Sequence, residues 1–247
     1  MHSNRRRSGR LWPAAPLALV LILASSSTAL AAGKPGYPDK ITWSGATWAI
    51  KTSRSPVGPG PNIYSNANVA VDAEGRLHLS ISRDASGAWT AAEIVGSITY
   101  GYGTYTFTID SPVAALDPSV VLGFFTWSDR ARFAHREIDV EFGRWGVAGD
   151  RNAQYVVQPY DAAGHLFRFD QPSVPTTTHQ FTWRPGRIDW LSRNSTGATI
   201  ASSTYAGSDV PPSSDETVRL NLWLFGGAAP TDGNPVEVIV RSFTFAP

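Results

Sequence analysis

The segment HREIDVEFGRWG, residues 135–146, alternates charged and apolar side chains with a period of two. This is the period of a β-strand, on which successive side chains point to opposite faces. The acids Glu137, Asp139 and Glu141 therefore share one face, and the apolar residues between them share the other. Neighbouring like charges on one face of a sheet repel each other, so stability alone does not account for this row.

Strand patterns continue through most of the chain. Residues 76–82 and 103–110 alternate apolar and polar side chains, and residues 120–127 are apolar throughout, as in a strand covered on both faces. Further strands are expected at 68–71, 153–160, 165–170, 179–183, 217–225 and 236–245, whereas residues 34–40 are expected to be a short flexible lead-in. No helix of three turns or more is predicted. The pattern predicts an all-β sandwich or jelly roll.

The first 32 residues have the three-part pattern of a secretory signal peptide. Four arginines between positions 5 and 10 precede a short apolar core at 16–24, and small residues follow with cleavage expected after Ala31 or Ala32. The alternative, a retained membrane anchor, needs a longer apolar run. We therefore expect a secreted protein, extracellular or periplasmic, with no membrane contact after cleavage. A single domain over residues 33–247 is predicted, acting as a monomer.

Composition excludes several classes of function. The chain has no Cys, which excludes disulfides, thiolate metal sites and cysteine nucleophiles. The formal net charge of +1 includes the four leader arginines, so the mature domain is slightly acidic and no nucleic-acid partner is expected. The histidines of the domain lack metal-like spacing. No metal site is predicted.

The spacing of the acids suits glycoside hydrolysis. A rise of about 3.3 Å per residue places the Cα atoms of Glu137 and Glu141 roughly 13 Å apart. On a bent strand, side chains that lean together bring the carboxyl groups close to the separation of about 5–5.5 Å used by retaining glycosidases. Asp139 between them would couple the titration of the three. The alternatives are a solvated outer strand face and a cation site without sugar chemistry.

Five segments, taken in order, resemble glycoside hydrolase family 16. EIDVEF (137–142) is similar to the family's Glu-x-Asp-x-Glu strand. Further similarity is seen in AEIVGSITYGYGTY (92–105), VLGFFTW (121–127), HQFTWRPGRIDW (179–190) and LNLWLFGG (220–227). The resemblance covers roughly residues 60–245. It implies a concanavalin-like β-jelly roll with a sugar-binding cleft on the concave face.

The resemblance also implies roles for individual residues. Glu137 would be the nucleophile, Asp139 the assisting acid and Glu141 the general acid/base. The uninterrupted spacing resembles the lichenase and xyloglucan branches of the family, and the expected substrate is a β-1,3- or mixed β-1,3-1,4-glucan. No cofactor is implied, although a structural calcium ion occurs in the family.

The chain also departs from the family pattern. Thr106 and Thr108 stand where we expect a Glu and an Arg that hold sugar hydroxyls, and Gln158 stands where lichenases carry Asn. These changes predict a related but different polysaccharide as substrate.

Several further residues are candidates for binding sugar. Trp127 and Trp145 flank the acid strand, and an indole suits the C–H face of a pyranose. Trp223 shares a strand face with Arg219 and Asn221, opposite a leucine face, so it is expected to line the cleft. Asn62 and Tyr64 lie in a Pro/Gly-rich loop where the family places cleft residues. The alternatives are packing in the core for the tryptophans and an ordinary turn for the loop.

Two other functions use the same fold. A non-catalytic, lectin-like carbohydrate-binding protein is one, because jelly rolls serve both purposes. A transglycosylase, which passes the same covalent intermediate to a sugar acceptor, is the other.

Overall fold

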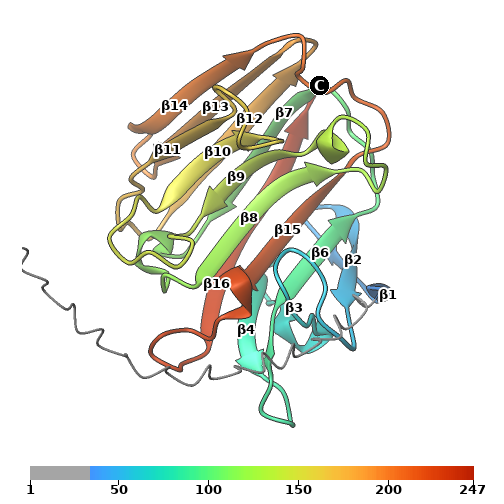
Figure 1. Ribbon diagram of the computed structural model, residues 1–247, viewed down its shortest axis with the longest axis vertical. Coiled ribbons are helices and arrows are strands. Elements are labelled where there is room, and N and C mark those ends of the chain that lie inside the picture. The colour runs from blue at the N-terminus through green and yellow to red at the C-terminus, as the bar shows by residue number, and fades with distance from the viewer. Residues whose placement is uncertain (1–33) are drawn as a thin grey trace, which may run out of the picture. The chain divides into compact units, whose positions relative to one another are not determined.

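The computed structural model describes residues 34–247, which form an all-β domain of two antiparallel sheets (Figure 1). Helical structure in this range is confined to four 3₁₀ turns of three residues each: η1 (Asn66–Asn68), η2 (Val113–Ala115), η3 (Ala134–Arg136) and η4 (Phe225–Gly227). The predicted jelly roll is confirmed. The predicted signal peptide lies outside the described residues, and between residues 34 and 247 no helix is long and apolar enough to cross a membrane.

The first sheet carries the acid strand. Its strand order is β1-β2-β6-β15-β8-β9-β10-β11, and the strands from β10 to β6 are seen in sequence across the front of Figure 1. The bounds are β1 (Gly36–Trp43), β2 (Ala46–Thr52), β6 (Ala92–Gly96), β15 (Thr217–Leu224), β8 (Val120–Trp127), β9 (Ile138–Phe142), β10 (Ala153–Val157) and β11 (Leu166–Phe169).

The second sheet lies behind the first. Its order is β14-β13-β12-β7-β16-β4-β3, and the two-residue strand β5 pairs with β4. The bounds are β14 (Thr199–Ala206), β13 (Arg187–Asn194), β12 (Thr177–Arg184), β7 (Gly103–Ile109), β16 (Val236–Ala246), β4 (Leu77–Arg83), β3 (Val69–Val71) and β5 (Trp89–Thr90).

The core fills the space between the sheets. The alternating strand β7 points Tyr105, Phe107 and Ile109 inward, while its threonines stay partly exposed. Phe107 of the second sheet stacks on Phe124 of the first, with ring centroids 4.5 Å apart. Such a pair contributes roughly 0.5–1.5 kcal/mol beyond its buried area. The apolar strand β8 is covered on both faces, as its sequence predicts, apart from its last residue, Trp127.

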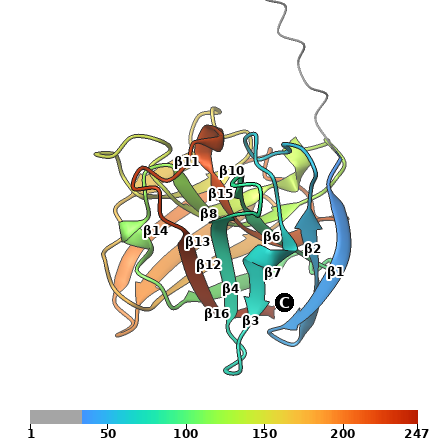
Figure 2. The same ribbon diagram turned by 90° about the horizontal axis from the view of Figure 1, so that it is seen from below.

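The prediction for residues 34–40 is wrong. From Gly36 onward this segment belongs to β1, which pairs with β2 along one side of the molecule (Figure 2). Edge strand β14 was also missed, because its sequence TIASSTYA is mostly small and polar and its residues remain largely exposed. Both strands lie at sheet edges, where only one neighbour and one buried face impose a pattern on the sequence.

Candidate active site

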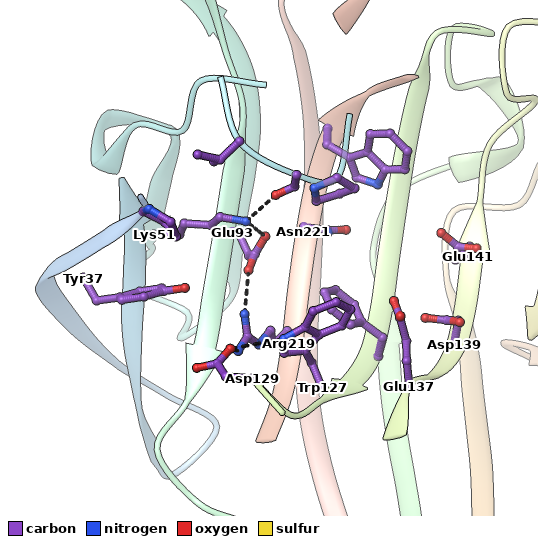
Figure 3. A pocket seen from close by; sticks show the side chains of 16 residues that line it. Tyr37, Lys51, Glu93, Trp127, Asp129, Glu137, Asp139, Glu141, Arg219 and Asn221 are labelled. Carbon is purple, nitrogen blue, oxygen red and sulfur yellow. Dashed lines mark hydrogen bonds and ion pairs between the residues drawn. The ribbon is translucent and has the colours of Figure 1, made fainter. Parts of the chain in front are cut away.

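A cavity of about 410 Å³ opens over the first sheet, and Glu137, Asp139 and Glu141 all line it (Figure 3). On the opposite face of β9, Ile138, Val140 and Phe142 are fully buried in the core. This is the division of faces that the alternating sequence predicts. The hydrophobic face anchors the strand between β8 and β10, and the anchored strand presents its three acids on the side of the cavity.

Glu141 belongs to a cross-strand row on the cavity face. The pairing registers place Glu93, Asn221, Gly123, Glu141 and Gln154 directly opposite one another on β6, β15, β8, β9 and β10. Residues opposite each other in antiparallel strands point to the same face. Gly123 stands in the middle of the row, where a side chain does not fit: a Cβ there would lie 2.6 Å from Oδ1 of Asn221. The row therefore has a gap at this position.

A left-handed turn leads directly into Glu137. The φ angles of Phe133, Ala134, His135 and Arg136 are 54°, 46°, 61° and 55°. This conformation costs roughly 1–2 kcal/mol for each non-glycine residue. Hydrogen bonds hold the turn: the Ser128 amide donates to the His135 carbonyl (2.7 Å), and the buried Arg136 donates from Nε to the Pro212 carbonyl (2.9 Å). The strained residues therefore lie directly before Glu137, the residue that we expect to act as nucleophile, and strain of this kind is often found at functional sites.

Glu137 and Asp139 share a hydrogen bond, and Glu141 raises the pKa of both. Burial, followed by repulsion from Glu141, raises the pKa of Glu137 above its usual range. Burial and the two neighbouring carboxylates raise the pKa of Asp139 well above its usual range. A hydrogen bond between these two side chains raises the pKa of Asp139 and lowers the pKa of Glu137. Asp139 is therefore the member of this pair that keeps a proton, and it can donate that proton to an ionised Glu137.

This proton sharing predicts a pH dependence of stability. Between the pKa of Asp in the unfolded chain, about 3.9, and its raised folded value, only the folded state holds the proton, so stability falls as pH rises. In Asp139→Asn that contribution is absent. Between pH 5 and pH 8 the unfolding free energy of both proteins should fall, and we expect the fall to be about 1–2 kcal/mol smaller in the variant than in the wild type. Urea unfolding at four pH values measures this, and parallel curves for the two proteins would contradict it.

Glu141 has a specific hydrogen-bond partner. Nε2 of Gln154 donates to Oε2 of Glu141 over 2.6 Å. Burial raises the pKa of Glu141, and this hydrogen bond opposes the rise. A carboxyl group with a raised pKa is suited to general acid catalysis at neutral pH.

Two of the predicted tryptophans line the cavity. Trp223 lies there with Arg219 and Asn221 from the same face of β15, as the sequence predicts. Trp127 stacks on His135 of the left-handed turn, with ring centroids 4.0 Å apart and planes within 9°. Its Nε1 donates to Asp129 over 3.2 Å. The indole plane beside Glu137 is thereby fixed.

The other predicted sugar-binding residues do not line this cavity. Trp145 packs against the cluster that contains Trp223. Asn62 is buried and bridges both backbone groups of Leu224, with bonds of 2.8 and 3.0 Å. Tyr64 is buried beneath the Lys51 ammonium group. Gln158 donates to Asp139 over 3.4 Å. In the described part of the chain these four residues therefore support the walls of the cavity through packing and hydrogen bonds.

A charged network missed in the sequence forms the far end of the cavity. Glu93 is almost fully buried; it forms an ion pair with Lys51 at 2.7 Å and lies 3.6 Å from Arg219. Arg219 also pairs with Asp129 at 2.9 Å. Tyr37 of β1 adds an aromatic wall (Figure 3). The local signals were Glu93 in an apolar strand and Arg219 on the same strand face as Trp223; the strand order brings these groups together with Lys51 and Asp129 from distant segments.

The interpretation of Thr106 and Thr108 as substituted sugar-binding positions is wrong. Both residues lie on β7, which belongs to the second sheet, and Thr108 faces Thr178 of β12 there. The acids lie on the first sheet. The Glu and Arg on the cavity floor are instead Glu93 and Arg219, supplied by β6 and β15.

Residues 34–247 contain no group of three or more His, Asp or Glu side chains placed to hold a metal ion. Nothing in these residues tests for the structural calcium ion that occurs in the family.

Comparisons with known proteins agree with this architecture. No family model matches the chain. A β-glucanase of Paenibacillus polymyxa is 26% identical over 162 residues, which span 63% of this chain and 62% of that protein. The match thus covers less than two thirds of the curated relative.

Solved structures extend the similarity to nearly the whole domain. A β-glucanase of Bacillus licheniformis aligns with a TM-score of 0.63 and 20% identity, over 88% of this chain and 99% of that structure. An immunostimulatory antigen described as a pseudo β-1,3-glucanase, from Mycobacterium tuberculosis, aligns with a TM-score of 0.60 and 19% identity, over 80% and 89%. The chain thus has the β-jelly-roll fold of the β-glucanases and is related in sequence to one of them, as its resemblance to glycoside hydrolase family 16 predicted.

Proposed function

We propose that the protein is a retaining endo-β-glycosidase of glycoside hydrolase family 16 that hydrolyses a β-glucan. One observation carries the proposal: Asp139, which is buried, and the partly buried Glu137 and Glu141 point to the same side of the acid strand and line a single cavity. Like charges that are shielded from water destabilise a fold, so stability does not explain this row. Acid–base chemistry on a sugar requires carboxyl groups that have raised pKa values and that face a cavity, and these three residues meet both requirements.

In the proposed reaction two carboxyl groups divide the work. Ionised Glu137 attacks the anomeric carbon, and Glu141 transfers its proton to the departing glycosidic oxygen as the C–O bond breaks. Asp139 donates its hydrogen bond to Glu137 before the attack. Glu141, now ionised, then takes a proton from water, and the resulting hydroxide releases the sugar from Glu137. Every group in this sequence comes from the chain itself, so we propose that no cofactor takes part.

The shape and charge of the cavity support a neutral polysaccharide. Lys51 and Arg219 are matched by Glu93 and Asp129, so the floor offers donors and acceptors without a strong net charge. Oδ1 of Asn221 is buried and has no hydrogen-bond partner in the described part of the chain, so it can accept a hydrogen bond from a sugar hydroxyl. Trp127 and Trp223 supply flat apolar surfaces for a pyranose ring. The solved neighbour from Bacillus licheniformis is itself a β-glucanase.

A substrate screen tests the proposal. The release of reducing ends is measured with barley glucan, laminarin, lichenan, xyloglucan, agarose and carrageenan. We expect turnover on one or more of the first three. Absence of turnover on all six substrates would overturn the proposal.

A second candidate is a catalytically silent carbohydrate-binding protein. The observation that favours it is the structural neighbour described as a pseudo β-1,3-glucanase. Binding of laminarin without release of reducing ends would support this candidate. Products longer than the substrate, formed when an oligosaccharide acceptor is added, would instead indicate transglycosylation.

We also propose that the protein is secreted, on the basis of the signal-peptide pattern in residues 1–32, and that it acts as a monomer. Determination of the N-terminus of the exported protein tests cleavage after Ala31 or Ala32.

A further inference from the structure

The row of side chains that contains Glu141 continues two strands beyond the cavity. Gln154 of β10 pairs with Glu141 on one side and with Arg168 of β11 on the other. The three side chains therefore share one face of the sheet. Glu141 and Arg168 are separated by two strand spacings, or about 10 Å between backbones. Gln154, which is only 9% exposed, fills the space between them.

Gln154 distinguishes the two oxygens of Glu141. Its Nε2 donates to Oε2 over 2.6 Å. An oxygen that accepts this bond is a poor site for the proton of the neutral acid, because the N–H and O–H groups would face each other. The proton of neutral Glu141 is therefore directed to Oε1. Gln154 thus fixes which oxygen acts as the acid.

Arg168 is held rigidly behind Gln154. Its guanidinium forms an ion pair with Asp150, and Nη2 donates to the Arg151 carbonyl over 2.7 Å. The indole of Trp145 lies against the guanidinium, 4.5 Å from ring centroid to Cζ. Nε of Arg168 is buried and finds no hydrogen-bond partner among residues 34–247. A buried, unpaired donor is unfavourable, so this arrangement is not explained by the ion pair with Asp150 alone.

Trp145 is in turn fixed by the frame of the site. Its backbone has a φ of 47°, and its ring packs against the cluster that contains Val121 and Trp223. The sequence suggested that this tryptophan stacks on sugar. Its position instead makes it a support for the charge of Arg168.

We propose that Arg168 is a positioning residue that controls the protonation of Glu141 through Gln154, and that Trp145 holds Arg168 in place for this purpose. The inference rests on the proposed function, in which Glu141 is the acid/base. It adds three residues to the reaction machinery that do not touch the substrate.

The groups around Glu141 shift its pKa in the directions that the proposal requires. Burial raises the pKa of Glu141, whereas the Gln154 bond and the positive charge of Arg168 lower it. Asp139 lies on the same strand and Glu137 directly before it, while β8, β15 and β6 present Gly123, Asn221 and Glu93 on this row. Arg168 is the cation that lowers the pKa of Glu141 and so limits the rise caused by burial.

The test follows the titration of Glu141 directly, by NMR of protein labelled with ¹³C in the Glu carboxyl groups, with the signal assigned by Glu141→Gln. We expect Arg168→Gln to move the titration midpoint of Glu141 upward by roughly half a pH unit. The change is this small because the negative charge of Asp150, the ion-pair partner of Arg168, offsets part of the positive charge that the variant removes. Arg168→Lys retains the positive charge, so its Glu141 midpoint should stay close to that of the wild type. Trp145→Leu should move the midpoint in the same direction as Arg168→Gln, but less.

Enzyme kinetics supply the second measurement. In Arg168→Gln the alkaline limb of kcat/KM should move to higher pH with the midpoint, while KM stays within about twofold of the wild type. The matched control is Arg241→Gln, which removes an exposed arginine of β16 on the second sheet from its ion pair with Asp110 and should leave both measurements unchanged.

Two results would overturn the inference: an unmoved Glu141 midpoint in folded Arg168→Gln, or a change in KM alone, which would make Arg168 a substrate contact. Thermal unfolding establishes that each variant is folded, and Arg168→Lys provides the comparison if Arg168→Gln is unstable. If the midpoint moves but no variant or wild type cleaves a glucan, the proposed function fails and the electrostatic role of Arg168 stands.

Discussion

Glu137→Gln is expected to lower kcat on the cleaved β-glucan by at least about 10⁴-fold, because removal of a covalent nucleophile leaves only binding and acid catalysis. The amide has nearly the same shape as the carboxyl group and can still accept a hydrogen bond from Asp139. Substrate binding should therefore remain. The rate is measured by reducing-end release, and affinity by isothermal titration with a short oligosaccharide.

The matched control for this variant is Glu74→Gln, since Glu74 lies in a surface turn with its side chain 66% exposed. It should retain wild-type activity. Chemical rescue then identifies the role: azide added to Glu137→Ala should yield a glycosyl azide of α configuration. A loss of less than tenfold in Glu137→Gln would show that this residue is not the nucleophile.

Glu141→Gln should lower turnover of the polysaccharide by about 10²–10⁴-fold, which is the usual contribution of a general acid or base. The loss should depend on the leaving group. In an aryl oligosaccharide with an acidic phenol, the phenolate leaves without protonation, so the glycosyl-enzyme should still form fast. Hydrolysis of the glycosyl-enzyme should become slow, because it needs Glu141 as the base. Pre-steady-state kinetics would then show a burst of phenol followed by slow turnover.

Azide distinguishes this variant from the first. With Glu141→Ala it should accelerate turnover and yield a glycosyl azide of β configuration. An equal loss on sugar and aryl leaving groups would contradict the assignment of Glu141 as the acid.

The sequence predicts the acid strand well because the relevant information is local. Alternation alone places Glu137, Asp139 and Glu141 on one face, and the buried residues between them fix the orientation of the strand. The same argument correctly places Trp223 beside Asn221 in the cavity. In each case a single strand, with one buried face, contains the whole pattern.

The rest of the site depends on strand order, which alternation does not specify. Lys51, Glu93 and Arg219 come from β2, β6 and β15, which become neighbours only in the folded sheet. Thr106 follows the Tyr-Gly segment closely in sequence, yet its strand belongs to the other sheet. Residues that are adjacent along the chain can thus lie in different layers of a sandwich.

Loop residues were the second source of error. Asn62 is predicted to bind sugar in the cleft, but its amide faces the backbone of Leu224 and is buried there. A polar residue in a Pro/Gly-rich loop suits either a ligand or the backbone groups that the loop leaves unpaired. Only the folded structure shows which of these it satisfies.

The central claim is that Glu137 and Glu141 act on one glycosidic bond from opposite sides, with a covalent intermediate between two displacements. The most direct test is ¹H NMR of the anomeric protons in the first minutes of glucan hydrolysis. Two displacements predict that the new reducing ends appear first as the β anomer and then mutarotate. Initial formation of the α anomer would show a single inverting displacement and would contradict the account.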